Sequence, residues 1–349
     1  MGQARPASNL IDIHAHFIPR SLVDGARAGR GFDGLTLGVR DGAPHLVHRQ
    51  GYAYPVKSEF HDPTARLEAM DRLGIDAALV SVSPTIYFYT VGAARGTDHA
   101  RSTNDALAAH VAQAPDRLSA LATIPLQSSR TAARELERAV STLGFRGASV
   151  GPRVGRQYLD DDRFTEVLDV AQALDVPLLV HPYYVGARAD LHDFYLTNLI
   201  GNPLDTTICA ARLILSGTLD RLPRLRLALV HGGGFLPYQI GRLDHGHRVR
   251  PEAQGCAMPP SRYLRRFVFD TITHSAEALA YLVRLVGADR VAFGTDLPFD
   301  MMSGSLDVQL GGRPLSSEDR AWISTGTAEV WFRPAGAPSP AGASEITTS

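Results

Sequence analysis

Short apolar runs alternate with longer amphipathic segments along most of the chain. Several runs are almost wholly apolar, such as VPLLV at 176–180 and LRLALV at 225–230, as is typical of parallel strands covered on both faces. Helix-like segments lie between the runs, so the pattern predicts an α/β protein with a (β/α)8 barrel of the TIM type. We expect its strands at Leu10–Ile13, Ala77–Val82, Leu118–Ile124, Gly147–Val150, Val176–Val180, Leu225–Val230, Phe267–Thr271 and Val291–Phe293.

The interval after the first predicted strand is too long for a simple connection. It separates His16 from a helix that opens near His61 and Asp62, and we expect His61 to cap that helix. Two strand-like pieces, LTLGV and PHLVHR, predict a small β-rich insertion at about residues 20–60, over the barrel mouth. The segment 334–349 has no hydrophobic period, which predicts a disordered tail after one domain at 1–333.

Two histidines end the first predicted strand. They are His14 and His16 in the run IDIHAH, and residues i and i+2 of a strand point to the same side. The carboxyl end of a barrel strand faces the mouth where such folds carry their chemistry. Two neutral imidazoles placed together there would form half of a site for zinc or a similar ion.

Three later strands run into similar polar residues. VPLLV leads into His181, LALV into His231 and VAFGT into Asp296. One such residue alone could be a core histidine or a turn aspartate. Because the carboxyl ends of barrel strands meet at one mouth, the set predicts a shared metal site.

These segments resemble the amidohydrolase superfamily, and within it the branch typified by aminocarboxymuconate-semialdehyde decarboxylase. The resemblance runs from IDIHAHFIPR through DPTARLEAMDRLGID and LRLALVHGGG to VAFGTDLPF. It implies a non-oxidative decarboxylase of a small aromatic or muconate-like acid, using metal-bound water. His231 would be the catalytic histidine, with Asp296 as proton relay. The implied metal ligands are His14, His16, His181 and Asp296.

The resemblance also bears on the number of metal ions. Binuclear members bridge two ions with a carboxylated lysine at the end of the fourth strand, but GASVGPR at 147–153 contains no lysine. We therefore expect one divalent ion, Zn²⁺, with Mn²⁺ as the alternative.

Three residues are candidates for substrate binding. The resemblance matches Arg242 and Arg250 to family arginines and implies that Arg242 binds the substrate carboxylate across a homodimer interface. A solvated helix end would explain Arg250 equally well. Tyr54 stands where the family has a second carboxylate-binding arginine, so we expect a monocarboxylate with an ortho hydroxyl or amino group. Asp270 and His274 end the seventh predicted strand, where either could line the site.

Other functions remain open or are disfavoured. A hydrolase or hydratase acting on a lactone, amide or alkene could use the same metal ligands. A serine esterase is suggested by GASVG at 147–151 and HGGG at 231–234, but the HGGG motif should precede the serine, and Ser149 runs into the helix-breaking Gly151 and Pro152. A purely structural zinc is disfavoured because such sites are usually closed and rich in thiolates.

Composition narrows the classes of partner. The chain has 35 Lys and Arg against 36 Asp and Glu, so it has no cationic excess for nucleic acid. Two cysteines indicate a reducing compartment. Neither an apolar run of about 18 residues nor a signal-peptide core is present. We expect a cytoplasmic enzyme that binds a small carboxylate and neither nucleic acid nor membrane.

Overall fold

A computed structural model describes residues 9–183 and 189–337. Its main sheet has eight parallel strands in the order β1-β5-β6-β7-β10-β11-β12-β13. All eight strands predicted from the apolar runs are therefore confirmed. Their bounds are β1 (Ile11–Phe17), β5 (Ala77–Val82), β6 (Leu118–Thr123), β7 (Ala148–Val150), β10 (Pro177–Val180), β11 (Arg226–Leu229), β12 (Phe267–Asp270) and β13 (Val291–Ala292).

Backbone hydrogen bonds close this sheet between its first and last strands. The Ile13 amide donates to the Phe293 carbonyl oxygen (2.9 Å), and the Asp296 amide donates to the His14 carbonyl oxygen (2.8 Å). A parallel bridge joins Ala15 to Leu297. The predicted TIM-type barrel is confirmed, and its closure places the segment after β13 directly beside the two histidines of β1.

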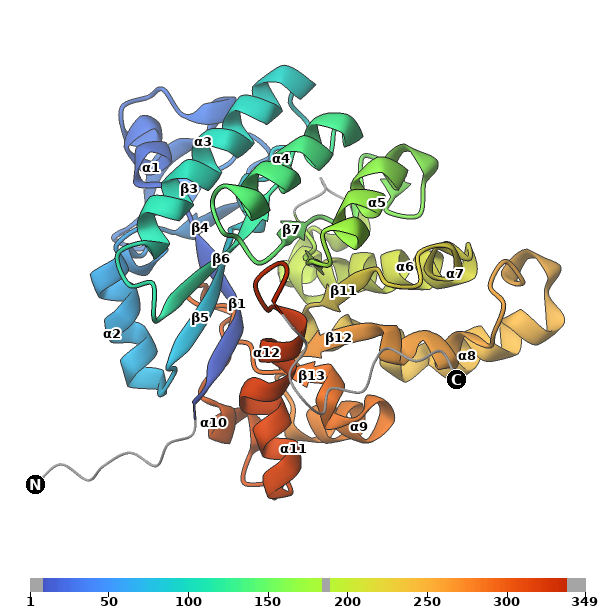
Figure 1. Ribbon diagram of the computed structural model, residues 1–349. Coiled ribbons are helices and arrows are strands. Elements are labelled where there is room, and N and C mark those ends of the chain that lie inside the picture. The colour runs from blue at the N-terminus through green and yellow to red at the C-terminus, as the bar shows by residue number, and fades with distance from the viewer. Residues whose placement is uncertain (1–8, 184–188, 338–349) are drawn as a thin grey trace, which may run out of the picture.

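Helices surround the barrel (Figure 1). The helix α2 begins after Asp62, whose carboxylate accepts a hydrogen bond from the Thr64 amide (2.9 Å). The expectation that His61 caps this helix is wrong, because His61 precedes the capping carboxylate. The helices are α1 (Arg20–Arg27), α2 (Pro63–Leu73), α3 (Ala93–Val111), α4 (Ser129–Ser141), α5 (Thr165–Ala173), α6 (Asn202–Leu215), α7 (Thr218–Arg221), α8 (Leu236–Val249), α9 (Ala276–Val286), α10 (Leu306–Leu310), α11 (Ser317–Ala321) and α12 (Thr327–Trp331).

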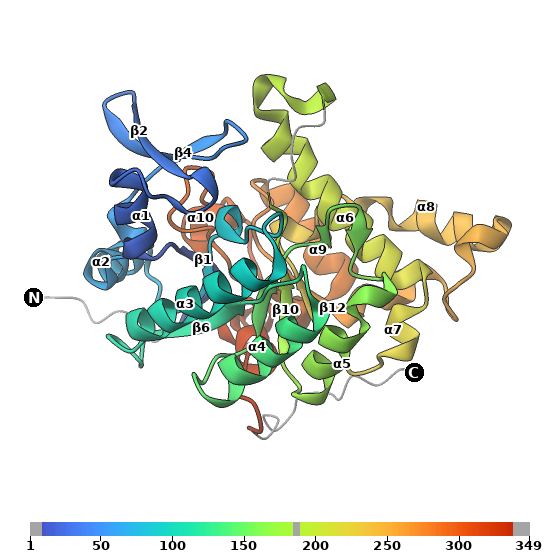
Figure 2. The ribbon, with the colours of Figure 1, turned by 90° about the horizontal axis from the view of Figure 1, so that it is seen from above.

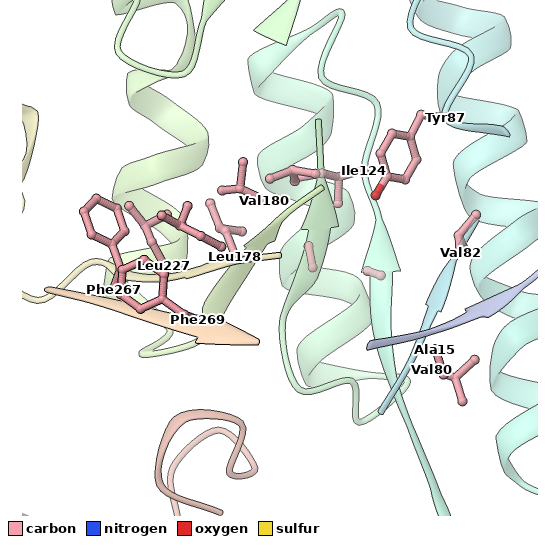
Figure 3. Close-up of a cluster of buried hydrophobic side chains, with 14 of the residues drawn as sticks. Ala15, Val80, Val82, Tyr87, Ile124, Leu178, Val180, Leu227, Phe267 and Phe269 are labelled. Atoms are coloured by element: carbon pink, nitrogen blue, oxygen red, sulfur yellow. The ribbon is translucent and has the colours of Figure 1, made fainter. Parts of the chain in front are cut away.

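The core has two layers because successive strand residues point to opposite faces. Leu178 and Val180 of β10 belong to the layer between strands and helices, which Figure 3 shows together with Val80, Val82 and Leu227. Leu179 belongs to a second cluster inside the barrel. Trp331 of α12 packs against this inner cluster, so apolar side chains fill the barrel below the mouth.

The predicted β-rich insertion is present. It contains β2 (Thr36–Arg40) and β3 (Ala43–Val47), which form a hairpin, and a third strand, β4 (Ala53–Pro55), which pairs with β3. This antiparallel sheet stands apart from the barrel strands in Figure 2. It places Tyr54 in a buried position opposite Leu46.

Two predictions concern regions near the limits of the structure. Residues 338–349 of the expected disordered tail lie outside the described residues, and the proposed domain boundary at 333 stays a prediction. Within 9–183 and 189–337, none of the helices combines the length and apolar character needed to cross a bilayer.

Candidate metal centre

Each predicted ligand lies at or just beyond the carboxyl end of a barrel strand. His14 and His16 lie on β1, where the strand register shifts between Asp12 and Ala15. His181 follows β10, and its amide donates to the Val150 carbonyl oxygen (2.8 Å). His231 follows β11 and Asp296 follows β13, both with positive φ, at 56° and 66°. Such backbone conformations are costly for non-glycine residues and persist where surrounding contacts hold them.

The structure brings these five side chains together. One ligand atom each from His14, His181, His231 and Asp296 lies within 4.8 Å of the other three. His16 Nε2 adds a fifth, 3.1 Å from His14 Nε2 and 2.8 Å from Asp296 Oδ1. His231 Nε2 lies farther out, 3.9 Å from Asp296 Oδ2.

The Nδ1 atoms of the ring ligands are engaged by other protein groups. His14 Nδ1 donates to Asp270 Oδ2 (2.7 Å), and His181 Nδ1 donates to the Pro182 carbonyl oxygen (2.6 Å). His16 Nδ1 lies 3.3 Å from Ser81 Oγ. These contacts select the tautomers of His14 and His181 that leave a lone pair on Nε2, the arrangement typical of metal-binding histidines.

The converging atoms fit a divalent cation. His181 Nε2 is buried and has no hydrogen-bond partner among the described residues. Asp296 Oδ1 is also buried and lies 2.8 Å from His16 Nε2 and 3.5 Å from His14 Nε2. An unpartnered buried acceptor is costly, and a metal ion could bind both His181 Nε2 and Asp296 Oδ1. Three imidazoles and one carboxylate are ligands that suit Zn²⁺ and similar ions.

Burial and neighbouring charges set the protonation of these groups. Burial lowers the pKa of His16 to about 4, and burial with the nearby histidines holds the pKa of His181 well below its usual range. Burial also disfavours charged His14, but Asp270 and Asp296 outweigh it and raise the pKa of His14 overall. Burial opposes ionisation of Asp296, yet contacts with His16 and His231 hold its pKa well below normal. These shifts keep His16 and His181 neutral and Asp296 ionised near neutral pH, the forms in which they can bind a metal ion.

Asp270 has a specific role that the sequence left open. Its Oδ2 orients His14, and its Oδ1 accepts from the amides of Gly232 (2.8 Å) and Ile272 (3.1 Å). One buried carboxylate thus joins a predicted ligand to the turn that carries His231. The only sequence signal was an aspartate at the end of a strand. His274, the other candidate there, lines a neighbouring cavity.

Asp12 and Arg66 hold the end of β1, and sequence reasoning missed both. Asp12 accepts from the amides of His14 (2.9 Å) and Thr295 (3.1 Å), and burial raises its pKa to about 6. Arg66, fully buried on α2, donates to the His16 carbonyl oxygen. Together they fix the strand backbone that positions two candidate ligands.

Two cavities meet at the centre. The larger is about 660 Å³ and lies toward α8 and α9, and the smaller is about 420 Å³ and lies toward the insertion. His231 and Asp296 line both cavities, whereas His181 and Tyr54 line only the smaller one. A small molecule in either cavity would therefore reach His231.

The predicted arginines lie elsewhere. Arg242 is exposed on α8, which projects from the barrel in Figures 1 and 2, and Arg250 follows that helix and pairs with Glu252 (2.8 Å). Neither is among the described residues that line these two cavities. Their roles in substrate binding stay predictions.

The esterase motif has no catalytic geometry. Ser149 is fully buried, and its Oγ lies 2.6 Å from the Tyr87 hydroxyl oxygen. The glycines after His231 have positive φ, and a Cβ on Gly233 would lie 2.6 Å from the Phe269 ring. They therefore allow a tight turn to pack on the barrel.

The chain is similar to known proteins over most of its length. An amidohydrolase family model matches residues 11–333. A 2-amino-3-carboxymuconate-6-semialdehyde decarboxylase of Dictyostelium discoideum is 29% identical over 295 residues, which are 83% of this chain and 82% of that protein. A solved 5-carboxyvanillate decarboxylase from Sphingomonas paucimobilis matches 94% of this chain and 100% of its own, with a TM-score of 0.80 and 28% identity. A solved dihydroxybenzoic acid decarboxylase from Polaromonas, with bound manganese and the inhibitor 2-nitroresorcinol, matches 93% of this chain and 97% of its own, with a TM-score of 0.72 and 27% identity.

Proposed function

Since this chain belongs to the amidohydrolase family, we propose that it is a metal-dependent, non-oxidative decarboxylase of a small aromatic carboxylic acid. The three similar proteins are all named as decarboxylases, in agreement with the resemblance predicted from the sequence. The structural observation that supports the proposal most directly is the convergence of buried ligand atoms at the barrel mouth, among them Asp296 Oδ1 and the unpartnered His181 Nε2. The enzyme class is then a carboxy-lyase.

His14, His16, His181 and Asp296 would hold one divalent ion. The region around β7 carries no lysine that could bridge a second ion. A bound metal would supply a Lewis acid that stabilises negative charge on substrate oxygens. The predicted ion is Zn²⁺, but a similar decarboxylase holds manganese, so we propose that Mn²⁺ also supports activity.

His231 is the proposed acid–base residue. Its side chain is 17% exposed, against 0% for His14 and His16, and it lines both cavities. Its Nε2 lies 3.9 Å from Asp296 Oδ2, so the two side chains can act together on a substrate bound at the barrel mouth. His231 can therefore contact a substrate in either cavity, whereas His14 and His16 are fully buried.

The reaction requires one proton at one carbon. Removing CO2 from an aromatic carboxylate breaks the bond between ring and carboxyl carbons and leaves an electron pair on the ring. His231 would protonate the ring carbon that bears the carboxylate, which interrupts conjugation. The carbon–carbon bond then breaks, CO2 leaves, and its electron pair restores the ring. Asp296 would help His231 to recover its proton.

A second copy of the chain would complete the site. We propose a homodimer in which Arg242 of one copy pairs with the reacting carboxylate in the other, as the family resemblance implies. Arg242 is exposed on a projecting helix, and Tyr238, four residues before it, exposes 79% of its surface. Phe194, before α6, exposes 86%. A mass measurement in solution tests whether the protein is a dimer. Loss of activity in R242A tests whether Arg242 contributes to the site.

CO2 release tests the proposed reaction. Protein loaded with Zn²⁺ or Mn²⁺ is supplied with ortho-hydroxybenzoates, ortho-aminobenzoates and aminocarboxymuconate semialdehyde. We expect metal-dependent CO2 release from at least one ortho-hydroxybenzoate. If metal-loaded protein releases no CO2 from the panel but hydrolyses lactones or amides, the decarboxylase proposal is wrong.

A further inference from the structure

The smaller cavity has an aromatic wall formed by the insertion and neighbouring loops. Tyr52, Tyr54 and Phe299 line it together with His181 of the metal centre. The Phe299 ring contacts His16 edge-to-face at 5.2 Å and Tyr54 at 5.7 Å, measured between ring centroids. The Phe299 ring thus contacts both Tyr54 and His16, a predicted metal ligand. A benzoate bound at the metal can therefore extend to Tyr54.

Among its described lining residues, this cavity has no lysine or arginine. Its histidines are His192 and, at the metal centre, His181 and His231, and Asp300 is its acidic residue outside the predicted ligands. Lys57 does not line it, and its ammonium group contacts the Phe299 carbonyl oxygen (3.5 Å). A second carboxylate at the aromatic wall, away from the metal, would lose its hydration without a lysine or arginine to pair with, which is unfavourable.

The hydrogen bonds around Tyr54 leave its hydroxyl proton available. Thr85 Oγ1 donates to the Tyr54 hydroxyl oxygen (2.7 Å), so Ser83, 2.7 Å from Thr85 Oγ1, must donate to Thr85. The Tyr54 hydroxyl also forms a long hydrogen bond with His48 Nε2 (3.4 Å), which a substrate oxygen at a shorter distance would replace. Burial raises the pKa of Tyr54, so the phenol remains a neutral donor.

From this geometry we infer that Tyr54 determines specificity. Its hydroxyl donates to a neutral oxygen substituent on the ring of an aromatic monocarboxylate, and the surrounding wall rejects a second carboxylate. This inference rests on the proposed function. It defines a substrate class, aromatic monocarboxylates that carry a further hydroxyl, methoxy or carbonyl oxygen.

The first experiment compares two substrates that differ only by one carboxylate. They are 2-hydroxy-3-methoxybenzoate and 5-carboxyvanillate, which is the same ring with a second carboxylate. We expect kcat/KM to be at least about tenfold higher for the monocarboxylate, because the second charge loses its hydration at the wall. An equal or higher value for 5-carboxyvanillate overturns the inference while the decarboxylase proposal stands.

The second experiment tests the Tyr54 hydroxyl. Y54F should lower kcat/KM by about tenfold for 2-hydroxy-3-methoxybenzoate or 2,6-dihydroxybenzoate, and by less than about twofold for 2-hydroxybenzoate, which has no further ring oxygen. The control is Y158F, which removes a hydroxyl that donates to Asp205 (3.0 Å) and lines neither cavity. It should change no substrate by more than about twofold. Equal losses on all three substrates with Y54F would show a structural role and overturn the inference.

A third variant changes the charge of the wall. Y54R should raise kcat/KM for 5-carboxyvanillate relative to 2-hydroxy-3-methoxybenzoate, because guanidinium pairs with carboxylate. Circular dichroism shows whether Y54R folds, and if it does not, Y54F decides. If no substrate releases CO2, the proposed function fails. In that case calorimetry measures the affinities of metal-loaded wild type and Y54F for the same compounds. Tighter binding of the monocarboxylate than of 5-carboxyvanillate, and weaker binding by Y54F only of compounds with a further ring oxygen, would support the inference. The absence of these differences would overturn it.

Discussion

Asp270 links the candidate metal centre to the turn that carries His231. Replacing it with alanine removes the acceptor for His14 Nδ1 and for the amides of Gly232 and Ile272. A buried donor without a partner costs about 1–3 kcal/mol, so D270A should lose several kcal/mol of unfolding free energy. D270N keeps one oxygen, which can accept either from His14 Nδ1 or from the two amides, and it removes the charge. Because groups that hydrogen-bond to ligating histidines influence metal affinity about 10- to 100-fold, we expect D270N to fold and to lose about 1.4–2.7 kcal/mol of metal binding.

Competition with a chromophoric chelator measures the metal affinity of D270N against wild type. The matched control is D76N, because Asp76 accepts from the Leu10 amide (2.8 Å) at the opposite end of the barrel. D76N should change unfolding free energy while metal affinity stays within about twofold of wild type. If D270N binds metal as tightly as wild type, Asp270 does not orient His14 for metal binding, and the role given to Asp270 is wrong.

Three further predictions concern catalysis, metal and pH. H231A should lower kcat by about 10²–10⁴ with nearly normal metal content, and equal loss of metal would make His231 a ligand. Chelation should abolish CO2 release, and Zn²⁺ or Mn²⁺ should restore it; full activity in metal-free protein would contradict the proposed chemistry. Burial lowers the pKa of His48 and His99 to about 4, from 6.5. Below pH 6.5 only the unfolded chain binds these protons, so urea unfolding of metal-free protein should show stability falling from pH 6.5 toward 4, less steeply in H99Q. Equal slopes for wild type and H99Q would contradict this.

Much of the site could be predicted because apolar strands end abruptly in polar residues. The runs before His181, His231 and Asp296 fix where each strand stops, and barrel geometry then brings those ends together. The pairing of Asp270 with His14 could not be predicted, because the two residues are 256 positions apart and many aspartates end strands. Arg66 was missed for a similar reason, since its bond to the His16 carbonyl crosses from helix to strand.

The insertion shows the limit of local patterns. The hairpin of β2 and β3 follows from two strand-like pieces, but β4 is only three residues long and ends at Pro55. Its strand character depends on pairing with β3, which local sequence does not encode. The same pairing buries Tyr54, so the feature that led to the inferred specificity became visible only in three dimensions.

Carboxyl-labelled 2,6-dihydroxybenzoate tests the central claim most directly. Metal-loaded protein in D2O is supplied with this substrate carrying ¹³C in its carboxyl group, and both products are followed by NMR. The account predicts ¹³CO2 and a resorcinol with one deuterium at the vacated carbon, neither of which forms after chelation. Unchanged label in the carboxyl group, with metal bound and the substrate shown to occupy the site, would contradict it.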